Sequence, residues 1–118
     1  MVRSGARTPE ELEGLFEDAF IVRDISALGS LFDDGAVLAV GRGLREVRGR
    51  DEIERAAAAM WDLDRTYVAE PWRVLQAGDT ALSLGRGINV VRRGRDGAWR
   101  FAIALIESER MEAMEERR

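Results

Sequence analysis

Two polar residues, Glu70 and Asn89, are the candidates for catalysis in this chain of 118 residues. The sequence has no cysteine, no histidine and no lysine, so all 18 of its basic residues are arginine. These absences exclude Ser-His-Asp and Cys-His catalysis, imidazole or thiolate metal sites, and Schiff-base chemistry. Proton transfer is left to carboxylates or to the single tyrosine, Tyr67.

Glu70 lies in a segment with β-strand character, one strand away from Asn89. If it points inward among aromatic side chains, burial favours its neutral form and prepares the carboxylate to act as a general base. The alternative is structural, namely an ion pair with Arg86 or Arg100, or exposure beside the following proline. A loss of turnover in Glu70→Gln with ligand binding intact would distinguish the two.

Asn89 is the only asparagine in the chain. On an inward sheet face its amide could donate a hydrogen bond to a ligand carbonyl. The alternative is that the amide holds a bulged strand in place or bonds to the backbone.

Bulky apolar residues at helical or alternate-strand spacing predict the surroundings of these polar groups. As a pocket lining they would favour a flat hydrophobic molecule of polyketide, terpenoid or aromatic type, and the alternative is an ordinary core. The residues concerned are Phe16, Phe20, Met60, Trp61 and Trp72.

Three helices are predicted to carry part of this set. Thr8 and Glu11 around Pro9 form a capping box, followed by an apolar stripe through Leu12, Leu15, Phe16, Ala19 and Phe20. Asp24 caps a short second helix that buries Leu28, Leu31 and Phe32 and ends at Asp33-Asp34-Gly35. A third helix begins near Asp51 and repeats the stripe at Ile53, Ala56, Ala57, Met60 and Trp61.

Strands account for most of the remainder. A short hairpin over residues 36–40 and 44–47 precedes the third helix, and a meander over 66–77, 80–93 and 98–108 follows it. Gly78-Asp79 and Gly94-Arg95-Asp96-Gly97 are its hairpin turns. Helices segregated from an antiparallel sheet predict an α+β domain.

Alternation along the meander predicts two apolar faces. The first face is dominated by small residues: Val68, Glu70, Trp72, Val74, Ala81, Ser83, Gly85, Gly87, Asn89, Ala102 and Ala104. The second carries Tyr67, Leu75, Leu82, Leu84, Ile88, Val90, Trp99, Phe101, Ile103 and Leu105. Because three helices cover only one face, we expect the second face, including Tyr67, to meet another copy of the chain in a homodimer.

The order of these elements resembles the NTF2-like superfamily, and most closely its small SnoaL-like or SgcJ-type domains. The resemblance is carried by residues 23–37, by Arg48-Gly49-Arg50-Asp51-Glu52-Ile53, and by 95–100. It implies a cone-shaped α+β fold with three N-terminal helices packed on a curved antiparallel sheet. It also implies one domain over residues 1–118, with its core at about 8–108 and a charged tail at 109–118.

Ketosteroid isomerases of this superfamily use a first-helix tyrosine, an aspartate at the end of the first strand and an aspartic acid on the long middle strand. At the matching positions this chain has Phe16, Ala39 or Val40, and Asn89, so two of the three roles are missing. The Arg-x-Asp of the related epoxide hydrolases is replaced by Gly87-Ile88-Asn89. Steroid isomerisation of that kind is therefore disfavoured.

Charge and hydropathy limit the partners. The net charge is −4, and we interpret the arginines at 42–50 and 92–95 as solvated surface rather than an RNA or anion site. We expect no metal, no cofactor, no membrane contact and a cytoplasmic location. The predicted function is binding of a small apolar ligand, extending to isomerase or cyclase chemistry. The alternative is a non-catalytic ligand-binding or dimerisation module.

Overall fold

The computed structural model describes residues 5–40, 45–62, 73–85 and 87–106. Among the predicted site residues, Tyr67, Glu70 and Trp72 lie outside the described residues. Within the described part, no helix is long and apolar enough to cross a membrane.

Two helices open the fold, and their caps explain where they begin. Helix α1 (Pro9–Val22) starts where Thr8 Oγ1 accepts a hydrogen bond from Glu11 N at 3.1 Å, as the capping box predicts. The Glu11 carboxylate accepts a hydrogen bond at 2.6 Å from the backbone N–H of Arg7, the residue before the cap. Helix α2 (Ile25–Gly29) begins at Asp24, whose carboxylate accepts from Ala27 N at 3.1 Å.

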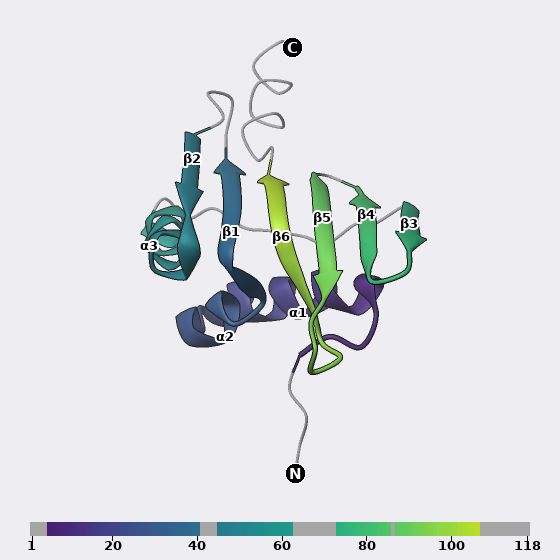
Figure 1. The fold of residues 1–118 in the computed structure, drawn as a ribbon. Coiled ribbons are helices and arrows are strands. Elements are labelled where there is room, and N and C mark those ends of the chain that lie inside the picture. Colours follow the sequence, from purple (N-terminus) through teal and green to yellow (C-terminus); the bar gives the residue numbers. More distant parts are fainter. Residues whose placement is uncertain (1–4, 41–44, 63–72, 86, 107–118) are drawn as a thin grey trace, which may run out of the picture.

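In the described parts of the chain, six strands form one sheet in the order β2-β1-β6-β5-β4-β3 (Figure 1). Strand β1 runs parallel to β6, and every other neighbouring pair is antiparallel. The expectation of a purely antiparallel sheet is therefore wrong, because the first hairpin adds to the final strand in the same direction. The bounds are β1 (Phe32–Val40), β2 (Arg45–Arg48), β3 (Arg73–Ala77), β4 (Thr80–Leu84), β5 (Ile88–Arg93) and β6 (Trp99–Ile106).

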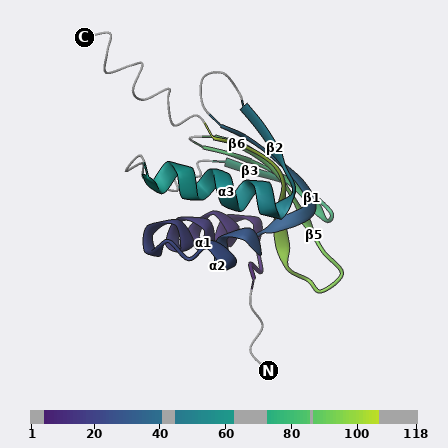
Figure 2. The same cartoon turned by 90° about the vertical axis from the view of Figure 1, so that its left-hand side faces the viewer.

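Helix α3 (Gly49–Asp62) follows the β1–β2 hairpin. The order of elements is as predicted, but only two of the three helices are N-terminal to the sheet, and the expectation of three is corrected accordingly. All three helices lie on one side of the sheet (Figure 2). The opposite side has no helix over it in the part of the chain that the structure describes.

The boundary between α2 and β1 differs from the prediction. Leu31 and Phe32 are buried as expected, but α2 ends at Gly29, and residues 33–35 lie inside β1. Arg50 explains part of this, since its Nε donates to Phe32 O at 2.9 Å and its guanidinium pairs with Asp34 at 3.3 Å. A long-range partner thus holds an Asp-Asp-Gly sequence in a strand where local propensity favours a turn.

The predicted strand over 80–93 is two strands. The chain reverses between Leu84 and Ile88, which pair with each other across β4 and β5. Ser83 pairs with Asn89 in this hairpin, so both side chains remain on one face, as in the continuous strand that the sequence suggested. The β3–β4 register is as predicted, with Val74 opposite Ser83.

At the start of β6, the prediction of which side chains face the core is wrong. Arg93 pairs with Trp99, so the turn is one residue longer than Gly94–Gly97, and the register shifts again between Val90 and Val91. Trp99 and Phe101 consequently point into the core and are 2% exposed. Ile103 keeps its predicted outward position, because the second shift restores the alternation.

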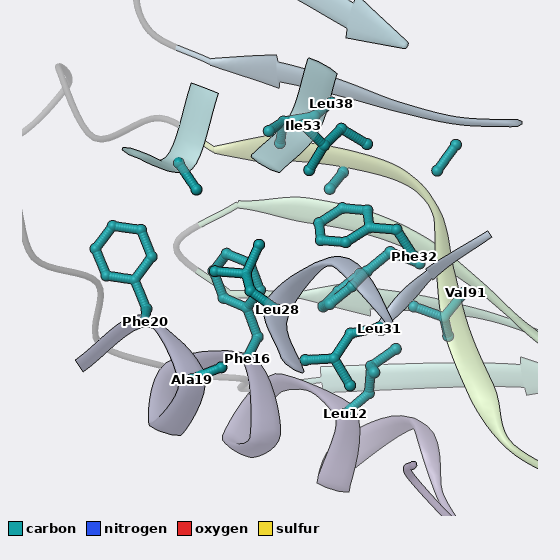
Figure 3. Packing of buried hydrophobic residues seen from close by; sticks show 14 of the residues in the cluster. Leu12, Phe16, Ala19, Phe20, Leu28, Leu31, Phe32, Leu38, Ile53 and Val91 are labelled. Atoms are coloured by element: carbon teal, nitrogen blue, oxygen red, sulfur yellow. The ribbon is translucent and has the colours of Figure 1, made fainter. Parts of the chain in front are cut away.

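The core lies between the helices and the sheet. Figure 3 shows Leu12, Phe16 and Phe20 pointing from α1 to the same side, toward residues of α2 and β1. Phe16 meets Phe101 edge-on with ring centroids 5.7 Å apart, and it contacts Phe32 at 6.0 Å. Such aromatic packing fixes the position of α1 over the sheet.

Candidate functional site

Glu13 is a buried carboxylate on the apolar stripe of α1. Its position precedes Phe16 by three residues and Phe20 by seven, so helical periodicity turns it to the face that carries both phenylalanines. Only 3% of Glu13 is exposed. Acidic residues are almost never buried to this extent unless their oxygens are hydrogen-bonded.

Two side chains of the sheet donate hydrogen bonds to Glu13. Ser83 Oγ donates to Glu13 Oε2, and Asn89 Nδ2 donates to the same oxygen at 3.1 Å. Ser83 is fully buried and Asn89 is 4% exposed. We call Glu13, Ser83 and Asn89 the polar cluster.

The β4–β5 hairpin positions the two donors. Ser83 and Asn89 are cross-strand partners, so their side chains stand side by side on the face that meets α1. Ala81 and Ala104 beside them are buried and small. This combination leaves the two donors directed at the helix that carries Glu13.

The polar cluster holds a buried carboxylate in one orientation. A carboxylate that accepts two side-chain hydrogen bonds within an apolar interior is held in one place and kept from most solvent. A fixed, desolvated carboxylate can accept a proton from a hydroxyl group or from an acidic carbon. The same geometry also serves a purely structural purpose, because it joins α1 to the sheet.

The structure brings together four of the predicted apolar lining residues. Phe16 and Phe20 contact each other with centroids 5.9 Å apart, and the Phe20 ring meets Trp61 of α3 at 5.4 Å. Met60 and Trp61 lie in the last turn of α3 and are also buried. Trp72, the fifth residue of the set, belongs to the part of the chain that the structure leaves undescribed.

Trp61 carries an unsatisfied donor. Among the described residues, its Nε1 is the buried side-chain polar atom that has no hydrogen-bond partner. It therefore lies at an aromatic contact with one polar group still free to bind.

Asn89 was predicted to face inward, and the structure places it there, donating to Glu13. Its action on a ligand carbonyl stays a prediction. Glu70 lies outside the described residues, so its role as a base also stays a prediction. Of its two proposed arginine partners, Arg100 pairs with Asp96 at 2.6 Å.

Sequence reasoning missed Glu13 and Ser83. The signal for Glu13 was present, because a charged residue occupies the i−3 and i−7 positions relative to Phe16 and Phe20 on an otherwise apolar stripe. The predicted stripe used Leu15 instead, which is only half-buried. For Ser83 no comparable signal exists, since small polar residues are common on sheets.

The arginines of the β5–β6 region are paired with aspartates. Arg92 contacts Asp33 at 2.9 Å, Arg93 contacts Asp79, and Arg100 donates to Asp96. The hydrogen bond from Arg100, followed by one from the backbone N–H of Ala98, lowers the pKa of Asp96 from 3.8 to about 2. In the described ranges, no group of three or more acidic side chains is arranged to hold a metal ion.

Comparison with known proteins identifies the fold but no close relative. No protein-family model matches the chain, and no curated protein matches it. Solved structures, in contrast, do match the chain. A ketosteroid isomerase-like protein from Erwinia carotovora atroseptica SCRI1043 is 21% identical, with a TM-score of 0.67 over 81% of this chain and 89% of that one.

Two further structures agree. ActVI-ORFA from Streptomyces coelicolor is 17% identical, with a TM-score of 0.59 over 80% of this chain and 90% of that one. An NTF2-like protein from Pseudomonas putida KT2440 is 18% identical, with a TM-score of 0.64 over 80% of both chains. Together with the α+β topology described above, these likenesses establish that the chain has the fold of the NTF2-like superfamily.

Proposed function

We propose that this chain binds a small apolar molecule between its helices and sheet, and that Glu13 exchanges a proton with it. The molecule belongs to the polyketide, terpenoid or steroid-like class, and the reaction is of the isomerase or cyclase type. The observation that carries the proposal is the polar cluster: one carboxylate and two donors within an otherwise apolar interior.

The physical cost of the polar cluster supports a functional role. Burying an ionised carboxylate is unfavourable even when hydrogen bonds compensate it, and apolar residues of similar volume often serve stability as well or better. A fold that needed only a contact between α1 and the sheet could use such residues. A buried carboxylate whose burial costs stability is therefore a candidate for function as well as for structure.

The proposed chemistry uses only residues of this chain. Glu13 accepts a proton from the carbon next to a ligand carbonyl, leaving an enolate, and then returns that proton to another position of the enolate. Ser83 and Asn89 keep the accepting oxygen in place. No metal or cofactor takes part in this step.

Proton exchange of 2-tetralone in D₂O, followed by NMR, tests this proposal. We expect the wild-type protein to accelerate loss of the α-proton signal, and Glu13→Gln to lower the rate by about 100-fold or more, the usual contribution of a general base. Glu10→Gln is the matched control, since Glu10 is exposed on the same helix. Exchange at the buffer rate in the wild type would overturn the catalytic proposal.

Glu70→Gln belongs in the same assay. If Glu70 is the base that the sequence suggested, its substitution abolishes exchange while 2-tetralone still raises the unfolding temperature. If Glu13 is the base, Glu70→Gln exchanges at the wild-type rate. The pair of variants thus separates the two carboxylates.

The second candidate function is non-catalytic ligand binding or dimerisation. It is favoured by the convergence of both donors on a single oxygen of Glu13, an arrangement suited to a structural connection. In that case 2-tetralone or a related compound binds, and no α-proton exchanges faster than in buffer.

We also propose that the outer sheet face forms a homodimer. Cross-strand pairing aligns Leu75, Leu82, Val90 and Ile103 in one row over four strands. Leu75 and Ile103 of this row and the nearby Ile88 are 46–50% exposed, which is unusual for large apolar residues on one face. A second copy, related by a twofold axis, would cover this face with the same face of its own.

A further inference from the structure

The unsatisfied N–H of Trp61 marks a second polar point in the apolar interior. The Trp61 side chain is 8% exposed, and its Nε1 meets no acceptor in the described parts of the chain. Buried tryptophan N–H groups usually have a partner, and leaving one unpaired costs free energy. An acceptor that arrives with a ligand explains the unpaired donor.

Trp61 and Glu13 lie at opposite ends of one apolar strip. Trp61 packs edge-on against Phe20, with centroids 5.4 Å apart, and Phe20 packs on Phe16. Glu13 is seven residues before Phe20 on α1, which corresponds to about 10 Å along a helix. The strip between the two polar points therefore consists of the phenylalanine side chains of α1.

Met60 offers a way for a molecule to reach this end of the core. It adjoins Trp61 in α3 and keeps 9% exposure, more than Phe20 at 2%. Methionine side chains adapt to different neighbours because they are unbranched and flexible.

We propose that the ligand is an elongated apolar molecule with oxygen groups at both ends, which extends along the phenylalanines of α1 from Trp61 to Glu13. Its carbonyl oxygen accepts a hydrogen bond from Trp61 Nε1, and its other end presents a hydroxyl or an acidic C–H to Glu13. This inference rests on the proposed function, and it defines the substrate class more narrowly.

A matched pair of probes tests the carbonyl contact: 4-acetyl-4′-hydroxybiphenyl and 4-ethyl-4′-hydroxybiphenyl. They share a hydroxyl end for Glu13 and differ only in the carbonyl. We expect wild-type protein to bind the acetyl compound about 2- to 10-fold more tightly by isothermal titration calorimetry, the usual value of one hydrogen bond. In Trp61→Phe the two affinities become equal, whereas Trp99→Phe, the same substitution at a buried tryptophan outside the proposed site, keeps the preference.

The outcomes separate this inference from the proposed function. Equal affinities in the wild type, or a preference that persists in Trp61→Phe, overturn the role of Trp61. If both compounds then still bind and Glu13→Gln weakens them, the proposed function stands. If neither compound binds, this inference fails, and the exchange of 2-tetralone alone decides the proposed function.

An NMR measurement on wild-type protein decides the matter if Trp61→Phe does not fold. The indole N–H signal of Trp61 is assigned through its contact with Phe20, and the signal of buried Trp99 serves as the internal reference. We expect the acetyl compound to move the Trp61 signal downfield and the ethyl compound not to. Identical responses to both compounds contradict the inference.

Discussion

Truncating Glu13 should destabilise the fold far more than truncating an exposed residue of the same helix. Glu13→Ala removes the acceptor of Ser83 Oγ and of Asn89 Nδ2, and both donors remain buried. Each unsatisfied buried donor costs about 1–3 kcal/mol, so the expected loss is about 2–6 kcal/mol. Domains have only about 5–15 kcal/mol of stability in total, and the variant should be close to unfolding.

A second variant separates two effects: the cost of leaving the buried donors without an acceptor, and the loss of the Glu13 side chain itself. The triple substitution Glu13→Leu, Ser83→Ala, Asn89→Leu removes all three polar groups together. Replacing hydrogen-bonded partners of a buried polar network together with apolar groups is often neutral or stabilising. We therefore expect the triple variant to be markedly more stable than Glu13→Ala, while it loses any Glu13-dependent exchange or binding.

Urea unfolding followed by tryptophan fluorescence measures these differences. Glu10→Ala, an exposed site on the same helix, should change the free energy of unfolding by no more than about 0.5 kcal/mol. If Glu13→Ala unfolds at the wild-type urea concentration, the polar cluster is not buried as described. A triple variant no more stable than Glu13→Ala would show that the unpaired donors of Ser83 and Asn89 are not the cause of the destabilisation.

Three further predictions concern other parts of the molecule. Ile103→Arg should convert the proposed dimer into a monomer by sedimentation, because it places a charge in the exposed apolar row, and an unchanged dimer would exclude this face as the interface. Asp24→Ala should cost about 1 kcal/mol of stability in thermal unfolding, the usual value of an N-cap, and no loss would mean that the cap is dispensable. The lowered pKa of Asp96 means that this carboxylate stabilises the folded chain above pH 3.8 and loses the effect as the pH falls toward 2. The stability difference between wild type and Asp96→Asn should therefore vanish over that range, and a constant difference would contradict it.

Much of the fold could be predicted because local signals agree with the tertiary structure. The caps at Thr8 and Asp24 and the apolar stripe of α3 have the predicted roles. The inward position of Asn89 was also predicted, although for a partly wrong reason. The sequence predicted one continuous strand, whereas the structure has a hairpin between Leu84 and Ile88. In both arrangements the side chains of Ser83 and Asn89 lie on the same face of the sheet.

The incorrect predictions concern contacts between distant segments and the number of residues in a turn. The facing of Trp99 depends on whether the turn has four or five residues, and composition does not decide that number. The parallel pairing of β1 with β6 joins residues that are 66 to 69 positions apart, and neither segment carries a local signal for it. Glu13 was missed because a carboxylate on an apolar stripe was not counted as part of it.

A crystal structure grown with 2-tetralone is the most direct measurement of the central claim. The account predicts the bicyclic ketone between α1 and the sheet, with its α-carbon or oxygen against the Glu13 carboxylate. It would be contradicted by an interior filled by protein side chains alone, with the ketone absent or bound away from Glu13.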